Sequence, residues 1–174
     1  MDLLGAHKVS YESIRRLAIE CHALSSSAQA LLERGDYEDA FGRTREVYEE
    51  LISEKLLGLA ISIRTKFYQG DDHRRTSGFL EEVGWLCKGL RAEEADVQRR
   101  FTLKDFCDKV LHASSVHFVV DPEFDTTYMS LHGNQLVKGA TEPWTLTVWL
   151  DLVSKGILGW LDALADDAED TSGA

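Results

Sequence analysis

Three ionisable side chains follow one another at intervals of four in the segment KDFCDKVLHASS. They are Lys104, Asp108 and His112. Four residues of an α-helix return almost to the same side, so these side chains would form one stripe. A histidine exchanges protons near neutral pH, a carboxylate can orient its ring, and a lysine can neutralise a phosphate. The stripe is therefore where acid–base chemistry on a phosphate ester is first suggested.

The helix that carries this stripe is expected to begin at Thr102, because Thr102 and Asp105 have the spacing of a capping box. With Leu103 at the centre of its buried face, four side chains lie within about 60° and His112 falls at about 180°. The four are Phe106, Cys107, Val110 and Ser114. The stripe is thus predicted to face away from the core that its own helix buries.

The whole chain predicts a mainly α fold, a bundle of about five helices with a small antiparallel β-hairpin or sheet insertion before the last helix. The second predicted helix is apolar almost all round in its second half, which is typical of a helix central to a bundle. The insertion includes a turn at His132-Gly133-Asn134. The predicted helices span about 11–33, 37–68, 77–89, a fourth from Thr102, and 151–166, and the strands are 116–120, 126–131 and a run from Trp144.

A single domain over 1–166, with its β insertion at about 116–149, is expected to precede an acidic, disordered tail at 167–174. The chain has 19 basic and 30 acidic residues and a formal net charge of −11. This balance disfavours general nucleic-acid binding unless a local basic patch supplies the charge. The three cysteines lie in apolar helical patterns, and no signal peptide or membrane-spanning run is recognisable, so a cytoplasmic protein with free thiols is expected.

Three histidines, His112, His117 and His132, lie close enough in the sequence to raise the question of zinc. Their spacing fits no standard ligand set, and no CxxC pair accompanies them. The sequence therefore predicts no metal ion and no other cofactor.

The stripe resembles the HEPN superfamily, whose hallmark is an arginine followed after four to six residues by a histidine, often with Asn or Asp directly after the arginine. Here Asp108-Lys-Val-Leu-His112 matches the second half of that motif, while Cys107 stands at the position of the arginine. The resemblance implies a helical bundle that dimerises with the motif at the interface. The superfamily contains bacterial ribonuclease toxins and phage-defence proteins.

Two functions follow from this resemblance, and an ordinary solvated helix face is the third interpretation. The first is a dimerisation or binding module in a bacterial defence or toxin–antitoxin system, with a homodimer and a possible partner protein or RNA. The alternative is a metal-independent endoribonuclease in which His112 transfers the proton, Asp108 orients it and Lys104 faces the phosphate. Four arginines are candidates for the missing cation or for RNA contacts, namely Arg99 and Arg100 before the helix and Arg43 or Arg45 on the second helix.

Overall fold

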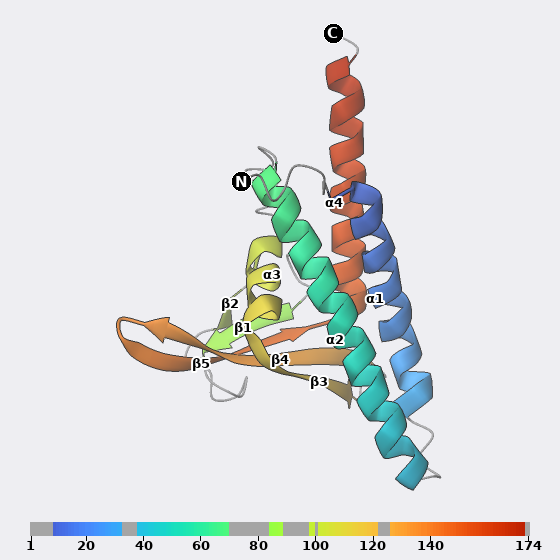
Figure 1. The fold of residues 1–174 in the computed structure, drawn as a ribbon, viewed down its shortest axis with the longest axis vertical. Coiled ribbons are helices and arrows are strands. Elements are labelled where there is room, and N and C mark those ends of the chain that lie inside the picture. The colour runs from blue at the N-terminus through green and yellow to red at the C-terminus, as the bar shows by residue number, and fades with distance from the viewer. Residues whose placement is uncertain are drawn as a thin grey trace, which may run out of the picture.

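The structure is a computed structural model that describes residues 9–32, 38–69, 84–88, 98–99, 101–121 and 126–172. Its helices and strands are, in chain order, α1 (Tyr11–Leu32), α2 (Glu38–Gln69), β1 (Gly84–Lys88), β2 (Gln98–Arg99), α3 (Leu103–His112), β3 (Ala113–Asp121), β4 (Thr126–Val137), β5 (Ala140–Val148) and α4 (Leu150–Ser172). The strands form one antiparallel sheet in the order β2-β1-β5-β4-β3. The helices gather on one side of it, with α1, α2 and α4 side by side and the short α3 beside α2 (Figure 1).

The predicted bundle of about five helices is wrong, because a five-stranded sheet makes up a large part of the described fold. The predicted third helix, about 77–89, is the main error. Its residues 84–88 form β1, which pairs with β5 from Gly84 opposite Val148 to Lys88 opposite Trp144. Leu86 and Cys87 are both buried although they point to opposite faces of the strand. A strand buried on both faces lacks alternation, so its apolar run also fits a helix. Residues 70–83 lie outside the described part of the chain.

The predicted turn at His132-Gly133-Asn134 is also wrong, because β4 runs through it and the chain reverses at Lys138-Gly139. Both turn residues have positive φ, 49° and 86°, as a tight two-residue hairpin requires. Gly133 instead makes room for a neighbour: a Cβ there would lie 2.2 Å from Cζ2 of Trp144. A glycine that reads as a turn is therefore a point of close packing inside a strand.

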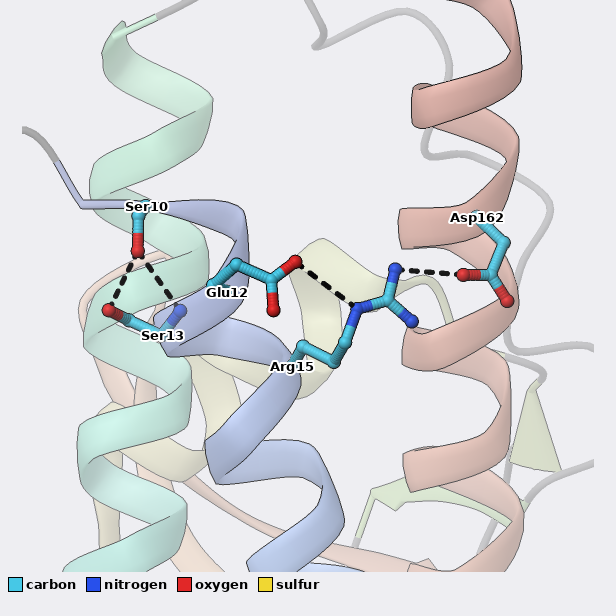
Figure 2. Close-up of polar contacts among 5 residues, drawn as sticks. All are labelled: Ser10, Glu12, Ser13, Arg15 and Asp162. Atoms are coloured by element: carbon cyan, nitrogen blue, oxygen red, sulfur yellow. Dashed lines mark hydrogen bonds and ion pairs between the residues drawn. The ribbon is translucent and has the colours of Figure 1, made fainter.

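The α1 helix is fixed at its N-terminus and against α4 by polar contacts (Figure 2). Ser10 caps the helix as predicted, its hydroxyl accepting from the Ser13 backbone N–H at 3.1 Å. Further along, Arg15 Nη2 lies 2.8 Å from Asp162 Oδ1 on α4 and its Nε lies 3.7 Å from Glu12. The ion pair joins helices that are far apart in the sequence. The α4 helix itself continues to Ser172, past the predicted end at 166 and into the acidic segment.

One hydrophobic core lies between the helices and the sheet. It includes Phe67 and Trp160, whose rings meet edge to face with centroids 5.6 Å apart. Cys21, Cys87 and Cys107 are all buried and free, as expected. Burial raises the pKa of the Cys21 thiol to about 12, so that thiol is unreactive near neutral pH. Within the described ranges, no helix combines the length and apolarity needed to cross a membrane.

Candidate functional site on the outward face of helix α3

The α3 helix begins with the predicted capping box. The Thr102 hydroxyl accepts from the backbone N–H of Asp105 at 3.1 Å, and Asp105 Oδ2 accepts from the backbone N–H of Thr102 at 3.0 Å. These two reciprocal bonds satisfy two N–H groups that the first helical turn leaves without partners. The start of the helix is thereby fixed.

The stripe faces outward, as its spacing predicted. Lys104 and His112 are exposed and Asp108 is half-buried, while the opposite side of the helix is in the core. The buried residues are Leu103, Phe106, Cys107 and Val110. Ser114, which was placed on the buried side, lies instead in β3 and is exposed. The helix ends at His112, so the helical period no longer applies to Ser114.

An arginine approaches the stripe from α2. Arg64 Nη1 lies 3.2 Å from Asp108 Oδ1, and Arg64 Nη2 donates to the hydroxyl of Tyr68 at 2.6 Å. The guanidinium also lies over the Tyr68 ring, 4.9 Å from its centroid. Stacking and two polar contacts hold the planar guanidinium in one orientation at the edge of the stripe.

The arginines named from the sequence do not reach this place or are not described. Arg45 donates to the backbone carbonyl of Phe118 at 2.8 Å and pairs with Glu49, and Arg43 is exposed. Arg99 lies in β2, but its side chain is outside the described part, as is all of Arg100. Arg64 was missed because its sequence neighbours are ordinary helix residues and only tertiary packing places it beside Asp108.

The stripe residues are not assembled as a proton-transfer unit. The Asp108 carboxylate is engaged by Arg64, and no hydrogen bond joins it to His112 among the described residues. Cys107 at the position of the motif arginine is fully buried, and burial raises the pKa of its thiol. A thiol carries no positive charge in either protonation state, so Cys107 cannot replace the arginine cation.

A second cation flanks α3 on the side of the sheet. Lys109 Nζ lies 4.3 Å from the centroid of the Trp144 ring and donates to Gln135 Oε1 at 3.0 Å. With Lys104 on the stripe and Arg64 from α2, it places three basic side chains around α3, one of them paired with Asp108, in a chain that is acidic overall. A local patch of this kind can attract an anion despite the net charge.

A different polar cluster lies on the face of the sheet opposite the helices. Along β4 and β5 the residues alternate, so Leu131 and Leu146 enter the core while His132 and Thr145 point to the other face. His132 is held at both ring nitrogens: Nε2 lies 3.2 Å from Ser130 Oγ and Nδ1 lies 3.2 Å from Thr145 Oγ1. The His117 ring from β3 is close by, with centroids 5.5 Å apart.

The sheet environment changes the titration of His132. Burial, together with the nearby His117, lowers the pKa of His132 below its ordinary value. The alternation Ser130-Leu131-His132 could have shown that these residues share a face with Thr145. This alternation was missed because His132 was assigned to a turn instead of a strand.

No protein-family model, curated protein or solved structure matches this chain. The resemblance to the HEPN superfamily therefore stays a prediction that depends on the α3 segment alone, because the helical bundle it implied is not the fold.

Proposed function

We propose that this chain is a homodimeric assembly module and that its self-association surface is the exposed side of α2 together with the α3 stripe. The observation that carries the proposal is a row of large apolar side chains left uncovered along α2. Their exposed fractions are 62% for Val47, 39% for Leu51, 45% for Leu57, 48% for Ile61 and 71% for Tyr68. Large exposed apolar side chains that gather on one side of a helix are typical of an interaction site.

Helical geometry places this row on one side. At 100° per residue the five side chains fall within an arc of about 120°, and the buried side chains of α2 fill the opposite arc. The buried set is Tyr48, Ile52, Leu56, Leu59, Ala60, Ile63 and Phe67. The near all-round apolarity of the second half of α2 is typical of a helix covered on every side. The described part of a single chain covers only one side.

A second copy of this chain fits the surface by charge. Glu50 and Glu54 are exposed on the N-terminal half of the row, whereas Arg64 lies at its C-terminal end. Two α2 helices packed antiparallel about a two-fold axis near Leu57 bring Glu50 of each copy near Arg64 of the other. Arg64 has five N–H donors, so it can keep its ion pair with Asp108 and also donate to a second carboxylate.

The same surface includes the α3 stripe, because Arg64, which donates to Tyr68 of the row, also pairs with Asp108 on α3. This dimer therefore agrees with the expectation that both stripes lie at or near an interface. A role in a bacterial defence or toxin–antitoxin assembly remains a prediction that rests on the α3 resemblance.

Light scattering of the chain, alone and at micromolar concentration, tests the assembly. We expect a dimer for the wild type and a monomer for Ile61→Glu, because an exposed side chain can be charged without damage to the core. The matched control is Ile19→Glu on α1, where the side chain is 51% exposed and lies off the row; this variant should stay dimeric. A monomeric wild type, or equal dissociation of both variants, contradicts the proposal.

A metal-independent ribonuclease is the second candidate, and Arg64 is the observation that favours it. A stacked arginine beside Asp108 supplies the cation that Cys107 cannot, one helical turn from His112. His112 would then transfer the proton of the ribose hydroxyl and the cations would stabilise the charge on phosphorus.

Cleavage of a mixed RNA substrate in the presence of EDTA tests this candidate. His112→Ala should lower the cleavage rate by about 100-fold or more, the usual effect of losing a general acid or base. Arg64→Lys should also lower it, because lysine lacks the planar, bidentate geometry of the guanidinium. Cleavage that is absent in the wild type, or unchanged in His112→Ala, leaves the assembly role alone.

A further inference from the structure

The two histidines on the outer face of the sheet are brought together by strand register. His117 on β3 is paired directly with Ser130 on β4, and His132 follows two residues later on the same face of β4. The rings therefore face each other diagonally across two neighbouring strands, with centroids 5.5 Å apart and planes at 51°. In the sequence these histidines are separated by 14 residues and a strand reversal, so no ligand spacing is visible there.

This separation matches the spacing of two imidazoles on one metal ion. With metal–nitrogen bonds of about 2.0–2.1 Å and a tetrahedral angle, the centroids of two coordinated rings lie about 5 Å apart. The observed 5.5 Å is close to that value, and coordination also requires a nitrogen of each ring to turn toward the same ion. His117 is exposed, so it is free to make this adjustment.

The ring of His132 is already oriented as a ligand. Its Nδ1 lies 3.2 Å from the hydroxyl of Thr145, a buried residue of β5. When Nδ1–H donates to that hydroxyl, the lone pair of Nε2 accepts from the Ser130 hydroxyl at 3.2 Å, and an ion bound at Nε2 takes the place of that one contact. A hydrogen bond that fixes the tautomer and orientation of a ligating histidine is a regular feature of metal sites.

We propose that this face of the sheet binds a divalent transition-metal ion of the zinc class, with His117 and His132 as its two protein ligands. Two imidazoles favour Zn²⁺, Ni²⁺ or Cu²⁺ over Mg²⁺ or Ca²⁺, which take oxygen ligands. No group of three or more His, Cys, Asp or Glu side chains gathers in the described part of the chain. In the site that we propose, the described residues therefore supply two ligands, and water fills the positions that the protein leaves open.

This proposal is independent of the assembly surface, since it uses another face of the molecule and none of the same residues. It departs from the sequence-based expectation of no metal. The reason is that antiparallel register, rather than spacing along the chain, places one ligand on each strand.

Isothermal titration of the untagged chain with ZnCl₂ tests the site, with MgCl₂ as a comparison. We expect one Zn²⁺ per chain in the wild type and no saturable binding of Mg²⁺. His117→Ala, an exposed change that leaves the fold intact, should weaken Zn²⁺ binding at least tenfold, and so should His132→Ala. The matched control is His112→Ala, because His112 is exposed but lies on α3; this variant should bind as the wild type does.

Visible absorption with CoCl₂ supplies an independent readout, because imidazole ligands give Co²⁺ a stronger and shifted spectrum that His117→Ala should abolish. Absence of saturable Zn²⁺ binding below about 1 mM overturns the proposal. Equal weakening by His112→Ala and His117→Ala overturns it as well, because the ion would then be bound without regard to this face.

Discussion

The outward face of α3 and the outer face of the sheet both present histidines, but they hold them in different ways. On α3, His112 is exposed, and the ion pair beside it joins Arg64 to an Asp108 side chain that is 37% exposed. On the sheet, His132 is half-buried and has a hydroxyl at each ring nitrogen. Water screens the first arrangement, whereas the hydrogen bonds of His132 go to hydroxyls of buried residues, Ser130 and Thr145.

The two faces therefore differ in how readily their side chains can exchange polar contacts while the fold stays stable. Side chains on α3 can change partners, since water replaces any contact that they lose, and this suits a surface that docks a second copy or an anion. His132 is more constrained at Nδ1, because its partner there, Thr145, is buried and a lost hydrogen bond at that point costs more than one that water can replace. A preset ring of this kind suits a small ligand that needs fixed geometry.

The largest expected effect comes from Gly133→Ala, which breaks the point where the two regions meet. Its Cβ would lie 2.2 Å from Trp144 Cζ2 and 2.8 Å from the carbonyl oxygen of His112. We expect the free energy of unfolding to fall by about 3 kcal/mol or more, as overpacking does in a close-packed core. Urea denaturation measures it. Gly159→Ala on α4, where nothing lies within 4 Å of the added Cβ, should instead be neutral or stabilising.

The next effect separates the two histidines of the sheet. His132→Ala removes both ring contacts and leaves the Ser130 and Thr145 hydroxyls without that partner, so a loss of about 2 kcal/mol in unfolding free energy is expected. His117→Ala should change it by less than about 0.5 kcal/mol, because the side chain is exposed. Equal losses of unfolding free energy in the two variants, measured by thermal or urea unfolding, would contradict the expected difference between the two histidines.

A pH series sharpens the contrast between the regions. The pKa of His132 is lowered in the folded chain, so the unfolded chain binds this proton first as the pH falls. The contribution of His132 is therefore complete above its ordinary pKa of about 6.5 and is lost as the pH falls from there to the folded value. Wild type should lose more unfolding free energy than His132→Ala between neutral and mildly acidic pH. A parallel pH dependence in the two proteins would contradict this assignment.

The smallest effect is expected on α3. Asp108→Asn removes the charge that pairs with Arg64, and the unfolding free energy should fall by no more than about 1 kcal/mol, because the pair is partly exposed. The difference from wild type should shrink further in high salt. A loss comparable with that of His132→Ala would mean that the stripe is part of the fold and not a replaceable surface.

Local signals in the sequence determined the helices and their faces. The capping box at Thr102, the cap at Ser10, the long helices α1, α2 and α4 and the outward direction of the α3 stripe are all visible in spacing. They depend on residues three or four apart, and a helix makes its hydrogen bonds over that range. The same local reading supplied Lys104, Asp108 and His112 as a surface feature, though it could not say whether they act together.

Tertiary structure alone decided the sheet and every partner across it. Residues 84–88 have a helical pattern but form strand β1, because they pair with β5. Gly133 suggests a turn but lies within strand β4, where its lack of a side chain makes room for Trp144. Arg64 beside Asp108 and His117 beside His132 likewise depend on contacts between distant segments. Strand partners and side-chain neighbours depend on how the apolar side chains of the whole core pack together. A short stretch of sequence includes only a few of those side chains, so it does not determine the pairing.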